Sequence, residues 1–190
     1  MRPELYAPSI EGEARLLLLI DAFTASTANL DGRTKLAKLD FLLRYPNFFR
    51  RAIQIKAPTA ELPPADPSDA NIEQRMVRWR YGPWDPAHPA LLGSLIGRGL
   101  IAPVSHNRGG VAYRTTDRGH ALAEDLASTE PWHDIAERAK TLKRHFGPQT
   151  GNSLKKFIYE HSPKSLTPLG RSRYEATHRT RCARRNDSRG

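Results

Sequence analysis

The chain has 190 residues, of which 38% are hydrophobic, and a formal net charge of +10, which allows one domain with extensions. The charge favours a polyanionic partner, although many small basic proteins bind none. A single cysteine, Cys182, excludes an internal disulfide framework and a zinc site built on cysteines. The apolar run 16–20 is too short to span a membrane and no signal-peptide pattern is visible, so we expect a cytoplasmic protein.

The first predicted helix covers residues 9–23. Glu11 and Glu13 in its first turn suit the positive end of the helix dipole. Its apolar residues form a wide stripe that should pack on a core: Leu16, Leu17, Leu19, Ile20 and Phe23.

A turn at 29–33 and a second helix over 35–45 follow, with Thr34 as the expected N-cap. The leucines of this helix share one face: Leu36, Leu39, Leu42 and Leu43. Lys35 and Lys38 should therefore point away from the core.

Pro46 interrupts the second helix, and residues 47–53 are expected to add one or two helical turns. The stretch 57–70 has four prolines, and its only charges are acidic. We interpret it as a mobile acidic loop rather than a domain boundary, because each flanking half is too small to hold its own core. A single domain over 1–161 is expected.

Aromatic residues cluster among arginines after this loop. Trp79, Tyr81 and Trp84 are predicted either to anchor a protein interface or to fill the core beside the second helix. Asp85 then provides an N-cap, and the next helix should start between residues 86 and 89.

Residues 91–126 are the most informative segment. An apolar helix is followed by extended runs at 101–106 and 111–115, which flank a glycine-containing turn at 107–110, and then by a helix over 117–127. This order predicts a winged helix-turn-helix. The fold class is thus α+β and mostly helical, with a β-hairpin wing and extra helices at both ends.

The segment 84–127 resembles the winged helix of MarR-like and PadR-like bacterial regulators. In those families the helix before the hairpin ends in Gly-Leu-Ile, as at 99–101, and the returning strand ends in threonine, two polar residues and glycine, as at 116–119. The resemblance implies that the helix over 87–99 would enter a DNA major groove.

That helix is poorly equipped to read bases. On its outer face it offers His88, Ser94 and Arg98 and little else. Gly93 and Gly97 are four residues apart, so another helix could pack closely there. A core or interface helix is therefore the favoured interpretation.

Phosphate contacts are better supported, because three arginines lie at or just after the wing: Arg108, Arg114 and Arg118. A second basic set belongs to a helix that Ser128 or Thr129 should cap, with Pro131 in its first turn, and that Gly147 ends: Arg138, Lys140, Lys143 and Arg144. A third set is Lys155–Lys156, on a shorter helix over 153–161. Each set could equally be solvated surface charge.

The sequence from 162 to 190 is expected to be a basic, disordered tail. Its part from 171 to 190 holds seven arginines against two acidic residues, and it has little to bury.

Catalysis is not expected. The chain has no HExxH, GxSxG, P-loop or GxGxxG motif, and its seven histidines are spread out without metal-ligand spacing. Asp40 is the one acid near an apolar face, and we expect it to be a cap or a partner of Lys38 or Arg44. No cofactor or metal is predicted.

Three segments are similar to the middle components of bacterial three-component ABC-ATPase conflict systems, a group that includes Lamassu-type anti-phage defence. They are 13–19, 34–46 and 80–85. The resemblance spans 9–161 and implies a non-enzymatic adaptor beside an SMC-like ATPase and an effector subunit. The arginine-rich tail departs from this pattern.

We therefore predict a non-enzymatic winged-helix component of a bacterial regulatory or defence assembly, which binds double-stranded DNA mainly through phosphates. Two alternatives stay open. One is a pure protein adaptor beside an SMC-like ATPase, and the other is a transcriptional repressor that dimerises through its terminal helices.

Overall fold

The computed structural model describes residues 8–24, 28–62, 78–79, 82–83, 85, 87–105 and 110–161, the two residue pairs by their backbone only. Within these residues the chain is mostly helical, with a small three-stranded antiparallel sheet and a separate two-stranded pair. An α+β class was predicted and is confirmed. Trp79 falls in the backbone-only part, and Arg108, Tyr81, Trp84 and the tail lie outside the described residues.

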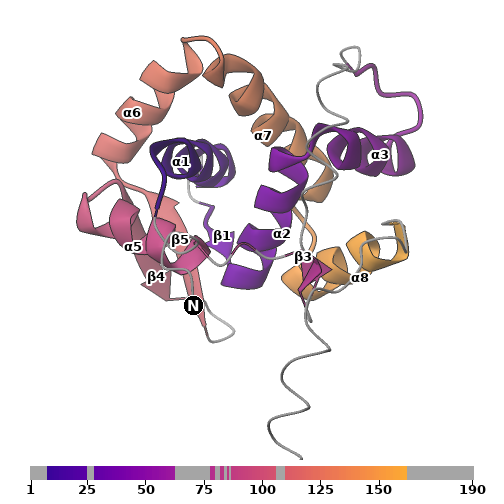
Figure 1. Cartoon of the computed structure of the whole chain (residues 1–190), viewed down its shortest axis with the longest axis horizontal. Helices are drawn as coiled ribbons and strands as arrows, with labels where there is room; N and C mark the ends of the chain where they lie inside the picture. The colour runs from indigo at the N-terminus through magenta and orange to yellow at the C-terminus, as the bar shows by residue number, and fades with distance from the viewer. Residues whose placement is uncertain are drawn as a thin grey trace, which may run out of the picture.

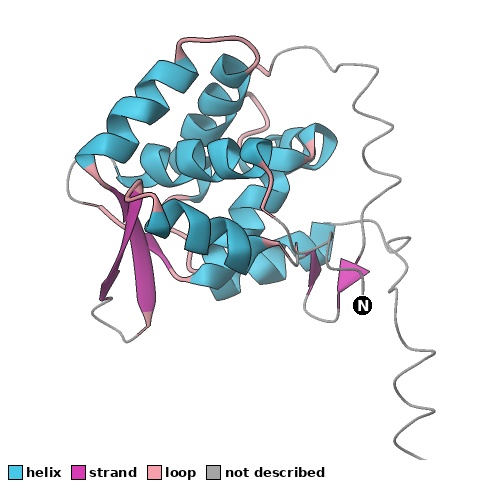
Figure 2. Ribbon diagram, turned by 60° about the vertical axis from the view of Figure 1, so that its left-hand side comes forward, coloured by secondary structure: helices cyan, strands magenta, loops and turns pink. Residues whose placement is uncertain are grey.

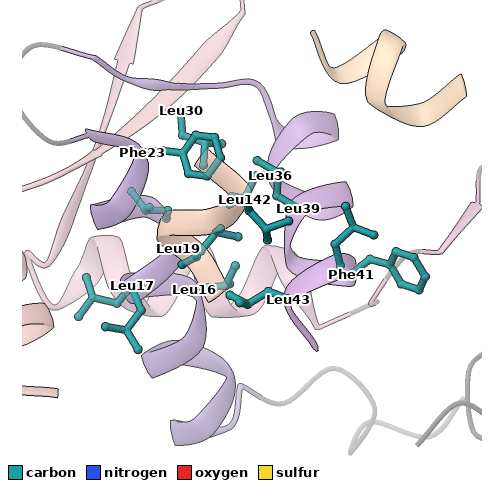
Figure 3. Packing of buried hydrophobic residues seen from close by; sticks show 14 of the residues in the cluster. Leu16, Leu17, Leu19, Phe23, Leu30, Leu36, Leu39, Phe41, Leu43 and Leu142 are labelled. Atoms are coloured by element: carbon teal, nitrogen blue, oxygen red, sulfur yellow. The ribbon is translucent and has the colours of Figure 1, made fainter. Parts of the chain in front are cut away.

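Helix α1 (Ile10–Thr24) forms the centre of the molecule. It contacts α2, α5, α6, α7 and β5 (Figure 1). Because neighbours surround it, Leu16 to Ile20 are buried without a break, so this middle part of the helix is apolar on every side. Figure 3 shows Leu16 and Leu19 of α1 close to leucines of α2 and to Leu142 of α7.

The three-stranded sheet has the order β1–β5–β4. β4 (Ile101–Ser105) and β5 (Val111–Thr115) pair as the predicted hairpin, with Ile101 opposite Thr115 and Ser105 opposite Val111. β1 (Leu30–Asp31) pairs antiparallel with β5. The expectation of a simple turn at 29–33 is therefore wrong, because Leu30 is buried as part of a strand too short to show a periodicity.

Helix α2 (Arg33–Arg44) begins two residues before its predicted start. Its N-cap is Gly32, whose φ of 80° is readily adopted only by glycine, and whose N–H donates to the Val111 carbonyl. Thr34 thus lies inside the helix and is not the cap.

Lys35 and Lys38 of α2 are both buried, against expectation. The single apolar face was misleading because α2 packs against α1, α3, α7 and α8 together. Lys35 Nζ donates to the Gly147 carbonyl at 2.6 Å and lies 5.6 Å from the centre of the Phe23 ring. Burial lowers the pKa of Lys35, and Asp31 opposes this effect.

Helix α3 (Pro46–Lys56) is longer than the one or two turns expected. Pro46 ends α2 and, through its fixed φ, also starts α3 as the first helical residue. Phe48, Phe49, Ala52 and Ile53 face the core.

Strands β2 (Arg78–Trp79) and β3 (Gly82–Pro83) pair with each other. Helix α5 (His88–Gly97) follows, within the predicted range of starts. Asp85 precedes it, and its Oδ1 accepts a hydrogen bond from the Ala87 N–H at 2.9 Å. Figure 2 shows the β4–β5 hairpin and the β2–β3 pair on opposite sides of the helices.

Three helices complete the described fold: α6 (Asp117–Ala127), α7 (Trp132–Phe146) and α8 (Gly151–His161). Thr116 caps α6 by accepting from the Gly119 N–H at 3.0 Å. The N-cap of α7 is Pro131, so the expectation of a Ser128 or Thr129 cap is wrong. None of the helices described is long and apolar enough to cross a membrane.

Candidate nucleic-acid interface

Of the arginines predicted at the wing, Arg114 and Arg118 are described and both are exposed. Arg114 lies on β5 opposite Ala102 of β4, and Arg118 lies in the first turn of α6. Arg118 follows Asp117 directly, and α6 also carries Glu124 and Asp125. Arg118 is the only lysine or arginine of this helix, so its positive charge sits in an acidic neighbourhood.

The second predicted set lies elsewhere. Lys140, Lys143 and Arg144 occupy the C-terminal half of α7, which runs beside α3, whereas the hairpin and the start of α6 lie across α1 from it (Figure 1). Lys140 and Arg144 are exposed and Lys143 is half-buried. Lys140 Nζ is 2.7 Å from Glu137 Oε1, which offsets one of these charges. The structure thus separates the described members of the predicted phosphate-binding set into two groups.

The polar side chains of α5 are engaged within the molecule. His88, expected on the outer face, is buried, and its Nε2 lies 3.1 Å from Asp40 Oδ2. Arg98, which follows the helix, donates from Nη1 to Glu13 Oε2 at 3.0 Å. The pattern misled because His88 sits at the very start of the helix, where it faces α2.

The exposed face of α5 is instead small and apolar. Pro89, Gly93 and Gly97 are exposed, and Ile96 is 37% exposed. A Cβ atom added at Gly93 or Gly97 would meet nothing within 4 Å. No described helix therefore packs against the two glycines.

Asp40 joins three helices in the core. Its Oδ1 accepts a hydrogen bond from Arg15 Nε of α1 at 2.7 Å, and its Oδ2 contacts His88 of α5. Burial alone would raise the pKa of Asp40, but the Arg15 charge and the His88 hydrogen bond outweigh it and hold that pKa well below its usual range. Asp40 was expected to be a cap or to pair with Lys38 or Arg44. It does form an ion pair, but with Arg15, while Arg44 pairs with Asp85 at 2.8 Å.

Helix α3 contributes basic residues that sequence reasoning missed. Arg50, Arg51 and Lys56 are its charged residues, and it contains no aspartate or glutamate. The excess of basic over acidic residues in this segment was visible in the sequence. It was overlooked because only one or two helical turns were expected after Pro46, whereas α3 continues to Lys56.

A cleft of about 320 Å³ separates α3 from α7, and its floor is formed by apolar residues such as Phe49 and Ile53. Residues 60–62 also line it. Its basic side chains are Arg50, Arg138, Arg144 and His145, and its acidic ones are Glu61, Asp134 and Glu137.

A second hollow lies on the other side of α3, against α8. Lys56 and Lys156 line it together with Glu160 and the polar residues at the start of α8. Lys56 Nζ lies 5.2 Å from the centre of the Phe157 ring, which is a cation–π contact between α3 and α8. Arg51 and His161 line a smaller hollow between the same two helices.

We define the basic face by α3, the part of α7 from Arg138 onward, and α8. Its cationic residues are Arg50, Arg51, Lys56, Arg138, Lys140, Lys143, Arg144, Lys155 and Lys156. This arrangement can attract an extended polyanion by charge. Among the described residues, no group of three or more histidine, cysteine, aspartate or glutamate side chains could hold a metal ion.

Comparisons with protein-family models, with curated protein sequences and with solved structures give no match. The residues and their geometry therefore carry the functional argument.

Proposed function

We propose that this protein is a non-enzymatic winged-helix component that holds double-stranded DNA through its backbone phosphates. The order of α1, β1, α2, α5 and the β4–β5 hairpin, with β1 paired to β5, supports a winged helix in which α3 and the β2–β3 pair are inserted between α2 and α5. In such a fold α5 takes the place of the recognition helix and the turn between β4 and β5 takes the place of the wing.

One observation favours phosphate contact over base recognition: the polar side chains at the ends of α5 are bound to other residues of the same molecule. Base recognition in a major groove needs donors and acceptors on the outer face of a helix. His88 is bound to Asp40, Arg98 is bound to Glu13, and the rest of the exposed face is apolar or glycine. Phosphate contacts need only exposed cations, which α3, α7 and α8 provide.

The same face of α5 favours a second function, a protein adaptor. Ile96 and the open space above Gly93 and Gly97 would allow a partner to pack closely on α5. An adaptor beside an SMC-like ATPase and an effector in a defence assembly would use this face. DNA contact and such docking are compatible, because α5 and α3 lie on different sides of the molecule (Figure 1).

Fluorescence anisotropy of a short labelled duplex, titrated with the protein across a salt series, tests the proposal. Phosphate binding predicts an affinity that falls steeply with salt, with a log–log slope of about −0.9 for each phosphate contact. Binding that is absent or independent of salt would exclude it and leave the adaptor. A shortened chain that ends at Ser162 is the control, because the arginine-rich tail could bind DNA by itself.

A further inference from the structure

Half of the exposed lysine and arginine residues that the structure describes lie on three helices, α3, α7 and α8. On α3, Arg51 and Lys56 are exposed, and the helix carries no acid to offset them. On α8, Lys156 is exposed, and Glu160 is the only acidic residue of that helix. Lys56 and Lys156 thus line one hollow between α3 and α8, and Arg51 lines the smaller one beside His161.

The α7 side of α3 continues this distribution. Arg138 and Arg144 line the cleft opposite Arg50. Three acids also line the cleft, but Glu137 is bound to Lys140 at 2.7 Å. Lysine and arginine side chains therefore occur on α7, on α3 and on α8 in turn. The cleft between α3 and α7 and the hollow between α3 and α8 leave room for the phosphate groups of a polyanion.

The two helices that contact β5 of the hairpin, α6 and α1, carry the opposite balance. Helix α6 has Arg118 against Asp117, Glu124 and Asp125. Helix α1 has Glu11, Glu13 and Asp21 against Arg15, and Arg15 is bound to the buried Asp40. Glu13 is buried and bound to Arg98, but Glu11 and the three acids of α6 are exposed. A DNA duplex that approached α5 and the hairpin would meet these exposed acids, and repulsion between like charges would offset the contacts of Arg114 and Arg118.

We propose that double-stranded DNA lies across the basic face of α3, α7 and α8, and not against α5 and the hairpin; this rests on the proposed function. Double-stranded DNA carries about one charge per 1.7 Å along its axis, and the basic face presents cations on three adjacent helices to such a row. The hairpin and α5 then remain open on the other side of the protein.

Two matched double variants of the full-length chain test this placement. Arg51→Gln with Lys156→Gln removes two exposed cations from the basic face, and Arg114→Gln with Arg118→Gln removes two from the hairpin side. Both leave the tail intact and change the net charge equally. We expect the first variant to lower duplex affinity by about tenfold or more, and to reduce the salt slope by about 2, while the second changes affinity by less than about threefold.

The result that overturns the placement is an equal loss in both variants, a larger loss in the hairpin variant, or no loss in either. Failure of the unaltered protein to bind any duplex would overturn the proposed function as well, so the two failures are distinguishable. Thermal unfolding checks that both variants fold. Acetylation footprinting of the unaltered protein provides a measurement that needs no variant: duplex should protect Lys56 and Lys156, and full reactivity of both would contradict the placement.

Discussion

His88 Nε2 lies 3.1 Å from Asp40 Oδ2, and both side chains are buried. Because Arg15 occupies the other oxygen of the same carboxylate, one side chain of α2 ties α5 to α1. The position of α5 therefore depends on a buried charge network as well as on the packing of Leu91 and Leu95.

Replacement of Asp40 by alanine should destabilise the protein by about 3–5 kcal/mol, because Arg15 would remain in the core without its carboxylate. Urea unfolding measures the loss. Arg44→Ala is the matched control, since it breaks the pair with Asp85 at a site where the arginine side chain is 45% exposed, and should cost less than about 1 kcal/mol. Equal losses in the two variants would show that the buried network contributes no more than an exposed pair.

Gly119→Ala should destabilise the protein by about 1–3 kcal/mol, because the new Cβ would lie 1.8 Å from the Leu100 carbonyl oxygen. The contact is with backbone, so α6 would have to move away from the strand that follows Leu100. Gly93→Ala is the opposite case: the position is mid-helix with open space, and the change should stabilise by roughly 0.5–1 kcal/mol. Thermal unfolding of both variants is the measurement, and a Gly119→Ala protein as stable as the unaltered chain would refute the close approach.

The stability of the protein should depend on pH through His120. Its Nδ1 lies 2.9 Å from Asp21 Oδ1, and this hydrogen bond, with the Asp21 charge, raises the pKa of His120. A raised histidine pKa stabilises the fold fully below the unfolded value of about 6.5, and the contribution is lost as pH rises through the folded pKa.

His120→Gln should therefore be less stable than the unaltered chain near about pH 6 and equally stable near about pH 8. The difference should stay below about 1 kcal/mol, because the His120 side chain is 55% exposed. Unfolding curves across this range provide the test, and a difference that grows with pH would have the wrong sign for a histidine bound to a carboxylate.

Lys38 should make the stability of the protein depend on pH in the opposite direction, at alkaline pH. Burial, with a smaller effect of the Lys155 charge, lowers the pKa of Lys38 to about 8 from 10.5. The folded state therefore pays its full penalty for the ammonium group below about pH 8 and is relieved as pH rises toward 10.5. The unaltered chain should gain stability relative to Lys38→Met between these two values, and a constant difference across that range would contradict the lowered pKa.

The sequence predicted those parts of the fold whose pattern is local. The β4–β5 hairpin and α6 were predicted within a residue of their bounds, because alternation, a glycine-containing turn and a threonine cap act over few residues. β1 was missed because its two residues become a strand only by pairing with β5, which is far away in the chain. The burial of Lys35 and Lys38 was missed for a related reason, since helices from the other end of the chain cover them.

The candidate site was harder to predict. The clustered charges of Lys140, Lys143 and Arg144 suggested a phosphate-binding set from the sequence alone. Only the fold shows that these residues lie on the helix beside α3, apart from Arg114 on β5. His88 and Arg98 looked available for DNA in the sequence, and their partners Asp40 and Glu13 are 48 and 85 residues away from them.

The protein should bind duplexes of equal length and unrelated sequence with affinities that agree within about threefold. A base-reading protein loses about 1–3 kcal/mol for each mismatched base pair, and the losses come from donors and acceptors in the groove. On α5 the His88 ring is buried against Asp40, and Arg98 can reach a base only by leaving Glu13. Competition of several unlabelled duplexes against one labelled duplex measures the spread, and Arg98→Ala should leave it unchanged. If one sequence binds more than about tenfold tighter and Arg98→Ala removes the preference, α5 reads bases after all, and Arg98 must exchange Glu13 for DNA.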